Sequence, residues 1–270
     1  MTSEVMIQSK FTKRFSKALM SLTLLSSLFS STVHAHFQEI IPSSDIVESA
    51  EQRSLTLDLT FTHPMELGPV MDMAQPKVLD VITPEGRASL LGNLSLSSQS
   101  GEAKRYQASY QIKKPGDHIF YIEPAPYWEP SEGVMIVHHT KVVVDALNGK
   151  ANWDALVGAP VEIEPLTRPY GLWTGNLFQG IVKKHGKPVP FAEVEVEWRN
   201  DGSVTVPFES YITQVFKADA NGVFSYVMPK AGWWGFAALV EADEKMKNPE
   251  GNLVPVEEGG LIWVRTRDMK

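Results

Sequence analysis

The sequence predicts an all-β protein of two β-sandwich, immunoglobulin-like domains in series, preceded by a cleaved signal peptide. Three observations favour this fold class. Apolar and polar residues alternate with a period of two along most of the chain, and short apolar segments recur between Gly- and Pro-containing turns. Long stretches with the helical period of 3.6 residues are missing.

Residues 1–35 have the pattern of a secretory signal peptide. A basic region precedes a short apolar stretch, 18–28, and the small residue Ala35 ends the segment. The apolar stretch is too short to span a membrane. We therefore expect an exported, periplasmic protein without stable membrane insertion, whose mature chain begins at His36.

A first β-sandwich, which we expect to bind metal, is predicted over residues 36–150. Its strands are expected at 53–63, 77–83, 104–113, 117–123 and 134–145. The turn Lys114-Pro115-Gly116-Asp117 is predicted to join two of them as a hairpin.

A linker is predicted at 151–174, where the alternation weakens and Gly, Asn and Pro accumulate. A second β-sandwich is predicted over 175–270. Its strands are expected at 175–184, 192–199, 211–217, 222–227, 235–241 and 260–267.

Composition excludes several classes of site. The 270 residues include no Cys, which excludes disulfides, thiolate metal sites and cysteine nucleophiles. The formal charge of −7 falls to −10 once residues 1–35 are removed, because that segment holds four basic residues and one acidic residue. An acidic chain disfavours nucleic-acid partners and favours cations near its surface.

The histidines are the candidate metal ligands. Imidazole suits nickel, cobalt, copper and zinc, and five of the six histidines after Ala35 lie in the predicted first domain, 36–150. An N-terminal His36 would offer its α-amine and its ring Nδ1 to one metal ion. His63 ends the strand 53–63 on the same parity as the apolar residues, so its side chain is expected to point inward.

His138 and His139 are adjacent on one predicted strand, so their side chains should point to opposite faces. The alternation places His138 with apolar neighbours, although either residue could be the ligand. His118 is a lower-ranked candidate.

The loop 63–73 contains Met65, Met71 and Met73 together with two carboxylates. Thioether sulfur suits Cu(I), so copper remains a candidate metal. Packing in the core or in the loop is the simpler interpretation of these methionines. Glu66, Asp72 or Glu129 could accept hydrogen bonds from ligating imidazoles and fix their orientation. The phosphate-binding glycine loop, the Gly-x-Ser-x-Gly elbow and the His-Glu-x-x-His motif are missing, so we expect a protein that is not an enzyme.

Four segments occur in an order that resembles an exported family labelled periplasmic component of nickel/cobalt transport systems. They are His36-Phe37, Phe61-Thr62-His63-Pro64-Met65-Glu66, Pro126-Tyr127-Trp128-Glu129-Pro130 and His138-His139-Thr140-Lys141-Val142-Val143. The second half resembles that family's immunoglobulin- or transthyretin-like module. The resemblance implies capture of Ni(II) or Co(II) in the periplasm and delivery to a membrane-embedded importer, with His36, His63 and His138 as ligands.

The leading hypothesis is therefore a periplasmic carrier of one divalent transition-metal ion, in which the amine and ring of His36 act with His63 and His138 or His139. Ni(II) or Co(II) is favoured and Cu(II) is possible. One alternative is an N-terminal-His copper protein, either a copper carrier or an oxidative polysaccharide-active enzyme. A second alternative is a metal-free carbohydrate-binding or structural sandwich protein.

Overall fold

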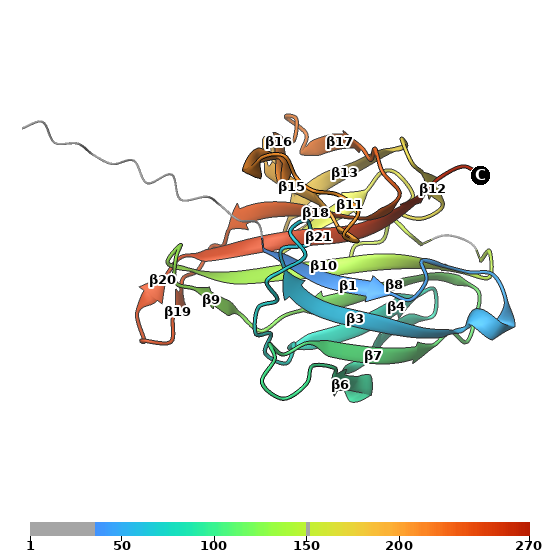
Figure 1. Ribbon diagram of the computed structural model, residues 1–270, viewed down its shortest axis with the longest axis horizontal. Coiled ribbons are helices and arrows are strands. Elements are labelled where there is room, and N and C mark those ends of the chain that lie inside the picture. The colour runs from blue at the N-terminus through green and yellow to red at the C-terminus, as the bar shows by residue number, and fades with distance from the viewer. Residues whose placement is uncertain (1–35, 150–151) are drawn as a thin grey trace, which may run out of the picture. The chain divides into compact units, whose positions relative to one another are not determined.

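The computed structural model describes residues 36–149 and 152–270 (Figure 1). The predicted signal peptide lies outside these residues. Their secondary structure is almost entirely β, which confirms the predicted fold class. The helical segments among the described residues are short 3-10 turns, namely η1 (Ala50–Gln52), η2 (Leu91–Asn93) and η3 (Glu209–Tyr211). No helix in this part of the chain is both long and apolar enough to cross a bilayer.

One large sheet contains strands from both halves of the sequence. Its hydrogen-bonded order is β16 (Gln214–Lys217), β15 (Glu193–Trp198), β18 (Gly232–Glu241), β21 (Val256–Arg267), β10 (Val134–Ala146), β8 (Gly116–Glu123), β4 (Val78–Thr83) and β5 (Gly86–Ser89). The short strands β2 (Ile46–Val47), β9 (Tyr127–Glu129) and β12 (Leu172–Trp173) pair with its central members. The strands from the two halves of the sequence are joined where β10 pairs in parallel with β21.

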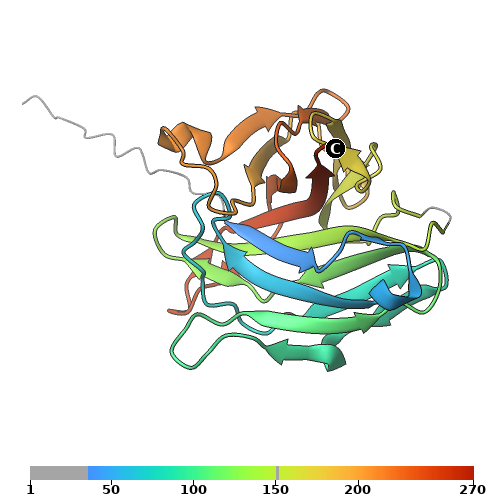
Figure 2. The ribbon, with the colours of Figure 1, turned by 45° about the vertical axis from the view of Figure 1, so that its right-hand side comes forward.

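Two smaller sheets complete the sandwiches. The first has the order β1 (Phe37–Pro42), β3 (Ser54–Thr62), β7 (Tyr106–Gln111) and β6 (Leu94–Leu96). The second contains β11 (Val161–Pro165), β13 (Leu177–Lys184), β14 (Lys187–Pro188) and β17 (Val223–Val227). A separate pair is formed by β19 (Met246–Lys247) and β20 (Leu253–Val254). Figure 2 shows the first small sheet, in blue and green, on one side of the long strands and the second, in yellow and orange, on the other.

Strands β18 and β21 contribute side chains to two hydrophobic cores, one on each face of the large sheet. Trp233 and Leu261 point into the core formed with β1 and β3, whereas their neighbours Trp234 and Ile262 point into the core formed with β13 and β17. Alternate side chains of a strand point to opposite faces, so one strand can supply two cores. This double burial explains the apolar run Leu261-Ile262-Trp263-Val264 in β21, which lacks the alternation of a half-exposed strand.

The structure differs from the sequence predictions at two connections. The predicted linker, 151–174, contains β11 and β12, and β11 pairs with β13 while β12 pairs with β21. The predicted hairpin at 114–117 is wrong, because β7 pairs with β3 and β6 whereas β8 pairs with β10 and β4. Almost every residue of β8 is buried, because one face packs into the first core and the other packs against Val157, Ala159 and Tyr170.

Candidate metal-binding site

His36 and His63 lie side by side because β1 and β3 are antiparallel neighbours. Phe37 pairs with Thr62, so the residue before β1 and the residue after β3 meet at the same end of the sheet. The two imidazole centroids are 4.6 Å apart, and both side chains are buried. Strand register thus joins two of the predicted ligand residues.

Glu129 of β9 holds the ring of His36. Its Oε2 lies 3.1 Å from Nε2 of His36, while its Oε1 accepts hydrogen bonds from the backbone N–H and the hydroxyl of Ser131. A carboxylate accepts hydrogen bonds, so the ring proton of His36 belongs on Nε2. Nδ1 is then the nitrogen whose lone pair is available, and it is the atom that a chelate with the α-amine requires.

The surroundings keep His36 neutral at neutral pH. Burial and the neighbouring His63 lower the pKa of His36 to about 4, against the opposing effect of Glu129. For Glu129, burial alone would raise the pKa, but the hydrogen bonds from Ser131 and the contact with His36 outweigh it and lower the pKa. A neutral imidazole beside an ionised carboxylate is the protonation state that metal ligation needs.

His138 approaches the same region from β10, and the ring of Phe61 lies near both His36 and His138. The Phe61 centroid is 5.5 Å from that of His36 and 6.0 Å from that of His138. His138 shares the inward face of β10 with Ile136 and Val142, as the alternation predicts. Phe61 therefore packs beside two of the predicted ligand residues.

A second carboxylate, Glu257 of β21, holds His138. Its Oε1 lies 3.0 Å from Nε2 of His138, and this contact keeps the pKa of Glu257 below its usual value although burial opposes the shift. The ring lies so close to the backbone of β21 that a Cβ on Gly259 would be 2.5 Å from its Cδ2 atom. Nδ1 of His138 is buried and has no hydrogen-bond partner.

Strand β15 adds buried carboxylates that the sequence analysis missed. Burial, followed by the nearby Glu257, raises the pKa of Glu195 to about 8, and Oε2 of Glu195 has no hydrogen-bond partner. Burial raises the pKa of Glu197 to about 7, although it accepts hydrogen bonds from Thr213 and from the Met65 backbone. The alternation Glu-Val-Glu-Val-Glu is typical of a half-exposed strand, but Glu195 and Glu197 are buried. At neutral pH Glu195 is therefore protonated, and Glu257, whose pKa is lowered, supplies the negative charge that favours a cation here.

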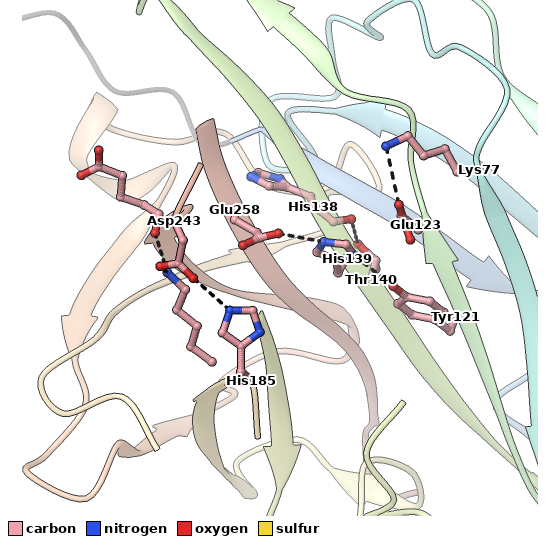
Figure 3. Close-up of polar contacts among 11 residues, drawn as sticks. Lys77, Tyr121, Glu123, His138, His139, Thr140, His185, Asp243 and Glu258 are labelled. Atoms are coloured by element: carbon pink, nitrogen blue, oxygen red, sulfur yellow. Dashed lines mark hydrogen bonds and ion pairs between the residues drawn. The ribbon is translucent and has the colours of Figure 1, made fainter. Parts of the chain in front are cut away.

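The remaining candidates lie elsewhere. His139 is on the opposite face of β10, where its Nδ1 lies 2.9 Å from the Tyr121 hydroxyl and its Nε2 lies 3.4 Å from Glu258 (Figure 3). His118 contacts the carbonyl of Gly116 and lines another cavity.

The side chains of the loop 63–73 have differing surroundings. Glu66 is exposed, and Asp72 is exposed and bonded to the backbone and side chain of Lys104. Met71 and Met73 are buried in the first core.

Within residues 36–149 and 152–270, no three His, Asp or Glu side chains are arranged to hold a metal ion together. The geometry supplies the reason. His36 and His63 are adjacent, whereas Nε2 of His138 points to Glu257. The four-nitrogen arrangement expected from the sequence is therefore not preformed by these three side chains.

Comparison with solved structures finds only distant likeness. The chimeric titin Z1Z2 functionalized with a KLER exogenous peptide from decorin is 13% identical, with coverage of 87% of this chain and 98% of that chain and a TM-score of 0.22. The D00-D0 domain of intimin is 13% identical, with coverage of 87% and 100% and a TM-score of 0.21. Dimeric latent PorU from Porphyromonas gingivalis is 12% identical, with coverage of 86% and 20% and a TM-score of 0.23. Scores this low carry no argument about fold or function.

The family comparison is more informative. No curated protein matches the sequence. A family model described as a domain of unknown function, DUF4198, matches residues 33–242, which include His36, the whole first small sheet and β10. The chain belongs to the DUF4198 family.

Proposed function

We propose that this protein binds a divalent transition-metal ion, Ni(II) or Co(II), in the periplasm and passes it to a membrane-embedded importer. The observation that carries the proposal is the contact between the imidazoles of His36 and His63, with Glu129 holding Nε2 of His36. Two adjacent imidazoles suit a borderline divalent cation. The proposal assigns binding and handover, and no catalysed reaction.

Three features support the assignment. Glu129 orients His36 as a carboxylate orients a ligating histidine in known metal sites, and it leaves Nδ1 for the metal. Removal of residues 1–35, as predicted, would add the α-amine of His36 to the donor set. Nearby Glu257 adds negative charge that favours a cation.

The test is a calorimetric titration of Ni(II) and Co(II) into protein that begins at His36. A matched protein with one extra N-terminal residue removes the amine chelate, and His63→Ala removes the second imidazole. His185→Ala is the control, because His185 is exposed and paired with Asp243 (Figure 3).

We expect one metal ion per chain, at least tenfold weaker binding in both altered proteins, and unchanged binding in the control. A tenfold change corresponds to about 1.4 kcal/mol. Equal binding in the His63→Ala protein and in the wild type would refute the assignment of the site, and failure of the wild type to bind would refute the function.

A further inference from the structure

An open hollow lies beside the edge strand β5, between the β4–β5 hairpin of the large sheet and β7 of the first small sheet. Its volume is about 470 Å³, which is in the range of small-molecule pockets. The lining residues that matter here are Glu85, Leu90, Asn93, Tyr110, Lys114 and His118. The hollow shares no residue with the His36–His63 pair or with Glu129.

His118 contributes a hydrogen-bond acceptor to this hollow. Its side chain is 2% exposed, and its Nδ1 lies 3.0 Å from the carbonyl oxygen of Gly116. A carbonyl only accepts, so the ring proton belongs on Nδ1 and Nε2 keeps its lone pair. Burial lowers the pKa of His118, so the ring is neutral at neutral pH. Nε2 has no hydrogen-bond partner among the described residues, and a ligand that donates a hydrogen bond would satisfy it.

Tyr110 lies beside His118 and adds a hydroxyl group. The two rings meet edge to face with their centroids 5.6 Å apart, and the Tyr110 ring packs in the same way against Phe120 at 5.2 Å. These contacts hold the ring, while its hydroxyl makes no hydrogen bond within the part of the chain that the structure describes. Burial, followed by the nearby Glu85, raises the pKa of Tyr110, so the hydroxyl stays protonated and can both donate and accept.

The charges around the hollow favour an uncharged ligand. Lys114 forms an ion pair with Glu85, and Arg87 forms one with Asp80. Lys113 is the remaining charged residue of the lining, and its side chain is exposed to solvent. An exposed ammonium group adds little to the binding of an anion. The polar groups that can bind a ligand here are therefore largely neutral.

Polar and apolar groups alternate on the same walls. The amide N–H of Asn93 donates to the Ser109 carbonyl, which leaves the side-chain oxygen of Asn93 as an acceptor. Leu90 and the Tyr110 ring supply apolar surface next to it. A sugar ring matches this combination, because its hydroxyl groups donate and accept while its C–H groups pack on aromatic and aliphatic side chains.

We propose that this hollow binds a neutral mono- or disaccharide, whose hydroxyl groups donate to Nε2 of His118 and hydrogen-bond with the hydroxyl of Tyr110. The site goes beyond the proposed metal function and does not depend on it. Binding is non-covalent, and the sugar leaves unchanged.

The test is saturation-transfer NMR of the processed chain with a panel of neutral sugars, followed by calorimetry of those that bind. The panel contains glucose, galactose, mannose, xylose, N-acetylglucosamine, maltose and cellobiose, with glucuronate as a charged comparison. Tyr110→Phe removes the hydroxyl and keeps the ring. His118→Asn keeps a donor toward Gly116 and removes Nε2. Tyr106→Phe is the matched control, because it makes the same change on the same strand outside the hollow.

We expect at least one neutral sugar to bind with one molecule per chain. Its affinity should fall roughly two- to tenfold in each hollow variant, as the loss of one hydrogen bond implies, and stay at the wild-type value in the control. Thermal unfolding establishes that each protein is folded, and two independent variants keep the test valid if one of them fails to fold.

Three outcomes would overturn the proposal. They are the failure of every neutral sugar in the panel to bind, binding of glucuronate alone, and an affinity in both hollow variants that equals that of the wild type or of the Tyr106→Phe control.

The sugar and metal proposals fail separately. His63→Ala should weaken Ni(II) binding and leave sugar binding unchanged, whereas Tyr110→Phe should do the reverse. If His63→Ala abolishes sugar binding, the sugar lies at the histidine pair and the hollow is refuted as its site, while the divalent-metal proposal is decided by the Ni(II) titration alone.

Discussion

Replacing Glu195 by Gln should stabilise the protein above neutral pH. Glu195 is 3% exposed, one of its carboxylate oxygens has no hydrogen-bond partner, and burial with nearby Glu257 raises its pKa from 4.5 to about 8. Between these two values the folded protein retains a proton that the unfolded chain has lost. The resulting stabilisation is fully present below pH 4.5 and is lost as the pH rises toward 8.

The magnitude follows from the width of this window. Each pH unit between the unfolded and folded pKa values corresponds to about 1.4 kcal/mol. Between pH 4.5 and pH 7, the wild type should therefore lose roughly 3 kcal/mol of unfolding free energy through Glu195. A glutamine of the same shape is neutral throughout, so the Glu195→Gln protein should not show this loss.

The assay is urea unfolding of metal-free protein at pH 5, 7 and 8, with Glu193→Gln as the control on the exposed end of the same strand. The stability difference between Glu195→Gln and wild type should be small at pH 5 and grow in favour of the variant by roughly 3 kcal/mol or more at pH 8. A difference that is independent of pH, or equal in the control, would refute the reasoning from burial and charge.

Three further predictions concern stability. Lys141→Met should lower the unfolding free energy by about 3–5 kcal/mol, because it leaves the buried carboxylate of Glu162 without its ion-pair partner. Chemical unfolding should show that adding Glu162→Gln recovers part of this loss. In Gly259→Ala the new Cβ would overlap the His138 ring, so the variant should lose about 1–3 kcal/mol of unfolding free energy by calorimetry. The same overlap should displace the ring, which NMR of the imidazole can follow. The pKa of His36 is lowered to about 4, so acidification from pH 6.5 to 4 should lower the unfolding free energy of the wild type by about 3 kcal/mol. The His36→Gln protein should lack this part of the acid sensitivity. Its persistence in that variant would contradict the prediction.

Strand identity was largely predictable, whereas strand partners were not. The alternation of Leu55, Leu57 and Leu59 located β3, and the long apolar run located β10. Strand β1 was missed because it is buried on both faces and has no alternation. The partners of β8 were assigned incorrectly, since a turn sequence shows that the chain bends but not which sheet receives the next strand.

The candidate site was predictable only in part. His36, His63 and Glu129 were named from their residue types and positions, and strand parity placed His138 on the inward face. Glu195 gave no such signal, because an acidic residue that alternates with valine usually faces solvent. Its burial depends on elements distant in the sequence.

By itself, the sequence determined the all-β class and most of the strands, because these follow from local alternation and turn residues. Only the tertiary structure decided that β18 and β21 contribute to two cores and that Glu129 and Glu257 each bind one imidazole. Those features arise from pairing between segments far apart in the chain. Such pairing is selected by the total burial and hydrogen bonding of the folded protein, which no local pattern encodes.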